Sequence, residues 1–321
     1  MDFVLPIKKM GLFTRSVLEG ITHFYHPSRI FIITCKEEII ILQKEIEKEH
    51  WSVSKNMIFI EEETYFVENY NLTKEYLEKV FEKQRKTPFS DHREFGWWYQ
   101  QLLKLGIFSQ IPSISQKYVV WDGDLIPLEK WDLWNPLNHR YYIAILQEES
   151  KSEFNKQQYD HYVDFLLGIS SKNPLPIGTF VTHHMVFDKE YVKEMMEIIM
   201  KRKRKNIDIP WPKYLLSLCS RFYRFSEYIL YSTFMHEYHS LDFYYYPYSE
   251  FGESGIRYRD ASEIIENIRN SLLIPISDNN NNNNNKKAYF TYQEIKDYFT
   301  NLKDKVKVTY VQMEHVYHLL Q

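Results

Sequence analysis

Two aspartates, Asp122 and Asp124, directly follow the apolar stretch Tyr118–Trp121 and are separated by a single glycine. Alternate residues of an extended backbone point the same way, so the two carboxylates face one side. Gly123 between them lets the chain bend and lets a ligand approach the backbone closely. Carboxylate oxygens suit a hard divalent cation, so the pattern predicts a metal site. The alternative is a simple Asp-Gly turn that ends the strand.

The segments before the two aspartates predict the fold that must position them. Apolar runs at 2–7, 29–34 and 57–60 are typical of strands, and the stretches 13–24 and 37–49 are typical of helices. Strands and helices that alternate at this spacing predict a parallel, doubly wound, nucleotide-binding half. The chain has neither a Gly-x-Gly-x-x-Gly nor a Walker motif, which argues against the standard dinucleotide and P-loop sites.

The segment 91–105 predicts a helix with two different faces. At about 100° per residue, one face is apolar and carries Phe95, Tyr99 and Leu102. The opposite face carries Trp97, Gln100, Gln101 and Lys104. A solvent-exposed face rarely carries tryptophan, so Trp97 and the glutamines are expected to line a cleft beside the aspartates. A helix that packs on two sides is the alternative.

Bulk composition narrows the class of protein. The chain has 321 residues and a formal net charge of −3, which argues against a dedicated nucleic-acid binder. Its two cysteines form no disulfide framework, which favours a reducing compartment. The first residues lack a signal-peptide pattern and no apolar run reaches about 18 residues, so a soluble cytoplasmic protein is expected. The aromatic content of 17% is attributed mainly to genomic base bias, with sugar stacking as the alternative.

Four stretches in order resemble a known group of proteins: residues 95–104, 122–124, 182–187 and 225–231. Together they resemble the DUF6492 group of glycosyltransferase-like proteins of the GT-A fold, over roughly residues 1–260. The resemblance implies an α/β fold of GT-A-like, Rossmann-like character, with a mixed, mostly parallel sheet flanked by helices. It also implies metal-dependent transfer of a sugar from a nucleoside-diphosphate-sugar donor to the hydroxyl of a glycan or another acceptor.

The resemblance further implies roles for residues around the Asp-x-Asp motif. Asp122 and Asp124 would bind Mn²⁺ or Mg²⁺ against the donor diphosphate, Asp124 most directly. His239 would be a further metal ligand, and an imidazole favours manganese over magnesium. Glu227 would be the base that takes the proton of the acceptor hydroxyl if the enzyme inverts configuration. A structural alternative for Glu227 is a helix whose N-terminus is capped by Ser226 and whose first turn favours an acidic residue.

The residues themselves and the same resemblance together indicate contacts to the two substrates. The donor would meet the end of the first strand and the surroundings of the motif, namely Pro6, Lys8, Arg93, Trp97, Gln101, Trp121 and Gly123. The acceptor would meet His183 or His184, and at most one of them reaches the cleft because adjacent strand residues point to opposite faces. The metal motif, the helix face of Trp97 and Gln101, and Glu227 are expected to converge on one pocket.

Residues 1–275 are expected to form one GT-A-like domain. Residues 276–288 contain an asparagine run and are expected to be a disordered loop. Residues 289–321 are expected to form a helical appendage, to which the resemblance assigns no role.

Two other functions are considered. A nucleotidyltransferase also pairs carboxylates around a metal, but it normally has a basic, glycine-rich loop after the first strand. Residues 8–11, with two lysines and one glycine, resemble such a loop only weakly. A non-catalytic glycan- or partner-binding module on the same fold would bind through aromatic side chains and would need no metal.

Overall fold

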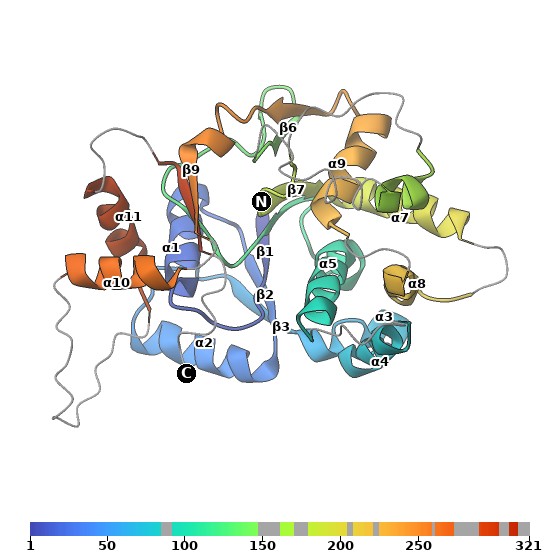
Figure 1. Cartoon of the computed structure of the whole chain (residues 1–321), viewed down its shortest axis with the longest axis horizontal. Coiled ribbons are helices and arrows are strands. Elements are labelled where there is room, and N and C mark those ends of the chain that lie inside the picture. Colours follow the sequence, from blue (N-terminus) through green and yellow to red (C-terminus); the bar gives the residue numbers. More distant parts are fainter. Residues whose placement is uncertain are drawn as a thin grey trace.

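A five-stranded sheet forms the centre of the computed structural model (Figure 1). The structure describes residues 1–84, 92–146, 161–169, 179–203, 208–220, 225–258, 261–272, 289–301 and 308–313. The sheet has the strand order β3-β2-β1-β4-β7. Its strands are β1 Asp2–Pro6, β2 Ile30–Thr34, β3 Met57–Glu61, β4 Lys117–Trp121 and β7 His184–Asp188. Neighbouring strands are parallel except for β7, which runs antiparallel to β4.

The burial of the strands explains their apolar sequences. Every residue of β1, β2 and β7 is buried, as expected for strands covered on both faces, whereas the edge strand β3 is half-buried. Helix α1 (Thr14–Tyr25) lies on one side of the sheet and α5 (His92–Gln110) on the other (Figure 1). The predicted class, a mixed and mostly parallel α/β sheet flanked by helices, is confirmed.

The remaining helices surround this core. They are α2 Lys36–Lys48, α3 Val67–Tyr70, α4 Lys74–Gln84, α7 Lys189–Arg202, α8 Trp211–Ser217, α9 Glu227–Tyr238, α10 Ser262–Ser271 and α11 Tyr292–Asn301. Short 3₁₀ turns occupy Glu62–Thr64, Leu218–Ser220 and Gly252–Ser254, and residues 161–167 are helical. Within the described residues, no helix has both the length and the apolar composition required to cross a bilayer.

The described residues also form two smaller sheets. Strands β6 (Tyr141–Ala144) and β8 (Phe243–Tyr246) pair in parallel. Strand β10 (Tyr310–Met313) lies between β5 (Leu125–Pro127) and β9 (Gly255–Tyr258), antiparallel to the first and parallel to the second.

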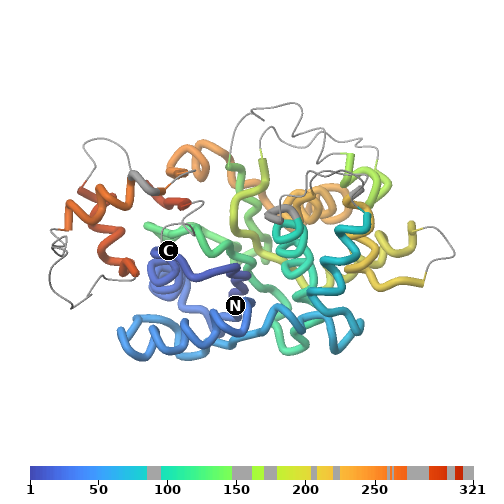
Figure 2. Tube along the Cα trace, turned by 60° about the horizontal axis from the view of Figure 1, so that its bottom comes forward, coloured from blue at the N-terminus to red at the C-terminus, as the bar shows by residue number. Residues whose placement is uncertain are grey.

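The C-terminal segment packs on the N-terminal half. Helices α10 and α11 lie side by side at one end of the molecule (Figure 2). The backbone amide of Tyr292 in α11 donates to Glu19 Oε2 of α1 at 2.9 Å, and the amide of Phe290 donates to the carbonyl of Leu12. The segment expected as a helical appendage therefore supplies a strand, β10, as well as a helix. The asparagine-rich segment 276–288 lies outside the described residues.

A buried aspartate at the start of β1 gives the fold a predicted pH dependence. Asp2 accepts hydrogen bonds from the Arg29 guanidinium at 2.6 and 3.1 Å and from Ser115 N and Oγ at 2.9 and 2.8 Å. Burial raises the pKa of Asp2, but these donors more than offset it, so the pKa lies below its ordinary value of 3.8. A depressed pKa stabilises the fold above pH 3.8, and this stabilisation is lost as the pH falls through the folded-state value.

We expect Asp2→Asn to lower the free energy of unfolding by about 1–3 kcal/mol at pH 7, because it weakens a set of charge-assisted hydrogen bonds. Urea denaturation of both proteins between pH 7 and pH 3 measures the difference. The difference should shrink as the pH approaches 3. A difference that stays constant over this range would contradict the assigned ionic role.

Candidate active site

The two aspartates of the motif lie in a turn at the carboxyl edge of the central sheet. Strands β1 and β4 are parallel and end side by side, and antiparallel β7 begins at the same edge. The amide of Asp122 donates to the carbonyl of His183 at 2.8 Å, and the amide of Leu125 donates to the carbonyl of Asp122 at 3.2 Å. A Cβ atom on Gly123 would lie 3.2 Å from Ile7 Cγ1, so glycine allows this turn to approach the segment after β1.

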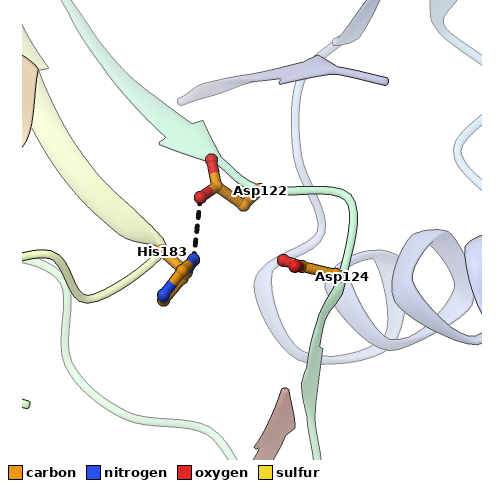
Figure 3. A group of neighbouring side chains, drawn as sticks. All are labelled: Asp122, Asp124 and His183. Atoms are coloured by element: carbon orange, nitrogen blue, oxygen red, sulfur yellow. Dashed lines mark hydrogen bonds and ion pairs between the residues drawn. The ribbon is translucent and has the colours of Figure 1, made fainter. Parts of the chain in front are cut away.

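Asp122, Asp124 and His183 form a group that fits a divalent cation (Figure 3). One potential ligand atom from each side chain lies within 4.8 Å of the other two. His183 Nδ1 is 2.9 Å from Asp122 Oδ2. Two carboxylates suit Mg²⁺ or Mn²⁺, and the added imidazole nitrogen favours the softer manganese. These three side chains therefore suit Mn²⁺ or Mg²⁺, the cofactor that the sequence predicts.

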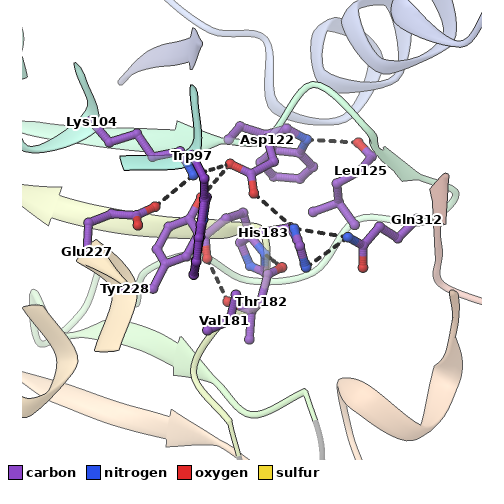
Figure 4. Close-up of polar contacts among 12 residues, drawn as sticks. Trp97, Lys104, Asp122, Leu125, Val181, Thr182, His183, Glu227, Tyr228 and Gln312 are labelled. Carbon is purple, nitrogen blue, oxygen red and sulfur yellow. Dashed lines mark hydrogen bonds and ion pairs between the residues drawn. The ribbon is translucent and has the colours of Figure 1, made fainter. Parts of the chain in front are cut away.

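A fully buried lysine joins this group to Glu227 (Figure 4). Lys104 Nζ lies 2.5 Å from Asp122 Oδ1 and 2.7 Å from Glu227 Oε1, and its side chain is 2% exposed. The hydroxyl of Tyr228 donates to Asp122 Oδ1 at 3.0 Å. Asp122 is thus held by Lys104, Tyr228 and His183 together.

The charges of this network shift one another's pKa values. Burial lowers the pKa of Lys104, but the attraction of Asp122 and Glu227 outweighs burial and raises it. Burial raises the pKa of Asp122, but Lys104 and His183 bring it well below its ordinary value. The pKa of Glu227 is raised, mainly by burial, with Lys104 acting in the opposite direction. Asp122 is therefore ionised and Lys104 protonated at neutral pH.

Glu227 begins α9 as the structural interpretation predicts. Ser226 caps this helix, its Oγ accepting from the amide of Ile229 at 3.4 Å. The Glu227 side chain is 1% exposed. The amide of Gln101 fits with its nitrogen toward Glu227 Oε2 and its oxygen 2.8 Å from Trp97 Nε1. Both carboxylate oxygens of Glu227 therefore have partners.

A cavity of about 530 Å³ lies in front of these residues. Its walls include all three members of the metal group, Lys104, Glu227 and Tyr228. Five residues predicted to contact the donor also line it: Pro6, Lys8, Trp97, Gln101 and Gly123. The cations Lys74 and Arg257 contribute to the same walls. The expected convergence on one pocket is therefore observed, although Tyr99, which the periodicity places on the opposite face of α5, also lines the cavity.

A family model described as "Family of unknown function (DUF6492)" matches residues 3–266. The chain belongs to the DUF6492 family. The resemblance inferred from the four ordered stretches is thereby confirmed. A search of curated proteins found no match.

Several solved structures are similar to this DUF6492 protein at low sequence identity. Mouse xyloside xylosyltransferase 1, in an apo form, is 11% identical with a TM-score of 0.44, and the match covers 97% of each chain. Core-mannan synthase A from Aspergillus fumigatus, in a Mn/GDP form, is 10% identical with a TM-score of 0.43, over 76% of this chain and 72% of that one. The apo bifunctional glycosyltransferase WbbM is 12% identical with a TM-score of 0.42, over 97% of this chain and 45% of that one.

The structure places His239 away from the metal group, which corrects the prediction that it is a ligand. His239 follows α9, where its Nε2 lies 3.0 Å from Glu194 Oε2 and its ring stacks on Tyr191 at 4.0 Å. Among the described residues, the histidine that lies beside the two aspartates is His183. The sequence assigned His183 to the acceptor and not to the metal, because nothing local shows which histidine the fold brings beside β4.

Of these two histidines only His183 lines the cavity, as predicted, but it precedes β7 and has a left-handed φ of 62°, so strand alternation is not the reason. His184 is 4% exposed, and its Nε2 accepts from Trp131 Nε1 at 2.9 Å. Burial lowers the pKa of His184 to about 4, so the ring is neutral at physiological pH. His184 is therefore a core residue, and the prediction that it contacts the acceptor is wrong.

Trp121 is likewise a core residue and does not reach the donor cavity. Its side chain is fully buried, its indole donates to the carbonyl of Leu125 at 2.9 Å, and it stacks on Trp131 with 5.5 Å between centroids. Adjacent residues of an extended chain face opposite ways, so a cavity-facing Asp122 directs Trp121 into the core. Arg93 lies in α5, but its side chain is outside the described part of the structure.

Three site residues received no role from the sequence: Lys104, Tyr228 and Gln312. Lys104 carried a usable signal, because it shares the helical face of Trp97 and Gln101. Tyr228 follows directly on Glu227 but had no pattern of its own. Gln312 reaches the site only because β10 pairs with β5, and the local sequence does not predict this pairing.

Proposed function

We propose that this DUF6492 protein is a metal-dependent glycosyltransferase that moves a sugar from a nucleoside-diphosphate-sugar to an acceptor hydroxyl. The observation that supports this most is the Asp122–Asp124–His183 group on the wall of a cavity of about 530 Å³. The cavity opens at the carboxyl ends of parallel strands, where α/β sheets bind ligands.

Mn²⁺ or Mg²⁺ is the proposed cofactor, with Asp124 as the most direct ligand. Lys104 and Tyr228 both hold Oδ1 of Asp122, so this carboxylate is fixed in orientation before any ligand enters. His183 replaces His239 as the proposed nitrogen ligand. A cation bound by these side chains would neutralise the charge that develops on the departing diphosphate.

Donor binding is proposed for the residues at the ends of β1 and β4. Pro6, Lys8 and Gly123 line the cavity beside the motif, and Trp97 and Gln101 line it from α5. Lys8 would supply a positive charge to a diphosphate bound in this cavity.

Glu227 is proposed as the base of an inverting reaction. The burial that raises its pKa favours proton uptake, and its place on the cavity wall supports the role. Lys104 at 2.7 Å opposes proton uptake. In a retaining reaction the same carboxylate would hold Lys104 and, through it, Asp122.

The test measures products released by the wild-type protein. The protein is incubated with Mn²⁺ and each of a panel of nucleoside-diphosphate-sugars, with water or simple glycosides as acceptors. Release of the nucleoside diphosphate from one donor, abolished by a chelator and restored by Mn²⁺, is the expected result. Pyrophosphate release from a nucleoside triphosphate and a sugar phosphate would instead indicate a nucleotidyltransferase. Metal-independent sugar binding without turnover would indicate a binding module.

A further inference from the structure

Strand β10 lies directly against the metal group, although it follows the family match by more than forty residues of sequence. It pairs with β5, the strand that begins just after Asp124, and Gln312 stands opposite Leu125 in that pairing. The amide of Met313 donates to the carbonyl of Asp124 at 3.0 Å. Residues beyond the family match therefore hold the backbone of the Asp-x-Asp turn.

The side chain of Gln312 reaches from β10 to His183. Its Nε2 lies 2.8 Å from His183 Nε2 and 3.0 Å from Nδ1, and the residue is completely buried. The His183 ring lies between Asp122 and Gln312 (Figure 4). The imidazole is therefore held from both sides before a metal arrives.

The backbone of His183 also requires support. Its φ of 62° lies in the left-handed region, which is uncommon for a residue with a side chain. Such a conformation is unfavourable by itself and persists where the surrounding structure imposes it. The bond from the amide of Asp122 to the carbonyl of His183 holds the backbone, and Gln312 holds the ring.

We propose that Gln312 is a positioning residue for the metal ligand His183, and that β10 is a required part of the metal site. This inference depends on the metal site of the proposed function. Partners that orient a ligating imidazole typically change metal affinity 10–100-fold when they are removed. A glutamine amide can donate to a ring nitrogen or accept from a ring N–H, so it suits either tautomer.

The test compares two substitutions in β10 of the full-length chain. Gln312→Leu keeps the volume of the side chain but removes its polar atoms. Val311→Ala is the control, because Val311 is also fully buried in β10 but is apolar and outside the proposed metal group. Isothermal titration with MnCl₂, without any nucleotide, measures the Mn²⁺ dissociation constant, and urea denaturation measures stability.

The expected result is that Gln312→Leu weakens Mn²⁺ binding at least about tenfold while Val311→Ala leaves it within about twofold, even if Val311→Ala is the less stable protein. Equal weakening in both variants would show that loosening β10 is sufficient and would overturn the role of Gln312. Unchanged Mn²⁺ affinity in Gln312→Leu would overturn it while leaving the proposed function intact. Absence of Mn²⁺ binding in the wild type would overturn the metal site and both proposals.

Discussion

Lys104→Met is expected to lower the free energy of unfolding by about 3–5 kcal/mol, because it leaves two buried carboxylates without their shared cation. Methionine has a similar length and an apolar tip, so the change removes charge with little loss of volume. Asp122 keeps the hydroxyl of Tyr228 and the ring of His183 as partners. Glu227, which is 1% exposed, keeps the amide of Gln101 and its own backbone amide, but no cation. Most of the penalty should therefore fall on Glu227.

The loss of stability in Lys104→Met should depend on pH, because it arises from the ionised form of Glu227. Burial already raises the pKa of Glu227 above its ordinary value of 4.5, and loss of Lys104 raises it further. A raised carboxyl pKa means that the folded state prefers the protonated form. The penalty is therefore small below about pH 4.5 and grows as the pH rises through the folded-state value.

Urea denaturation at pH 7 and at pH 4.5 measures the effect, and Lys104→Met/Glu227→Gln is the matched control. Glutamine removes the orphaned charge but keeps the shape and a hydrogen-bonding group, so the double variant should regain most of the lost stability. A double variant as unstable as Lys104→Met, or a single-variant loss below about 1 kcal/mol, would refute the buried-charge account.

Asp124→Asn is expected to abolish the stabilisation of the protein by Mn²⁺ together with a nucleotide-sugar. Asparagine keeps the size of the side chain but removes the negative charge that a divalent cation requires of its most direct ligand. In the wild type, a ligand at about 100 times its dissociation constant adds about 2.7 kcal/mol to the free energy of unfolding. Most of this increment should be absent from the variant.

Thermal unfolding with and without Mn²⁺ and nucleotide-sugar provides the measurement, and each protein is compared with its own ligand-free midpoint. Asp132→Asn is the control, because Asp132 is an exposed aspartate eight residues along the chain and outside the metal group. The control should retain the full ligand-induced shift. A shift of wild-type size in Asp124→Asn would remove Asp124 from the metal site and direct the search to another carboxylate.

Much of this protein could be inferred from local sequence patterns. Apolar runs such as Ile30–Thr34 predicted buried parallel strands, and the spacing of Asp122 and Asp124 predicted two carboxylates on one side. The periodicity of α5 predicted that Trp97 and Gln101 share a cavity-facing side. These features succeed because each is a property of one element, determined by the repeat of the backbone and by which face is buried.

The strand pattern also predicted that only one of two neighbouring histidines would reach the site, but not which one. Trp121 and Asp122 are also neighbours, so their side chains are expected on opposite faces. The sequence alone did not show that Asp122, and not Trp121, would face the cavity. The alternation along a strand shows which side chains share a face, but not which of the two faces is buried. The tertiary structure decides this, here by stacking Trp121 on Trp131 in the core.

The completed site was decided by tertiary structure alone. His183, not His239, meets the aspartates because β7 pairs with β4, and Gln312 meets His183 because β10 inserts beside β5. Lys104 acquires its two carboxylate partners only when α5, β4 and α9 pack together. Contacts between segments this distant in sequence depend on the free energy of packing the whole chain. The sequence by itself therefore determined the elements and the paired carboxylates, and the fold determined which side chains complete the site around them.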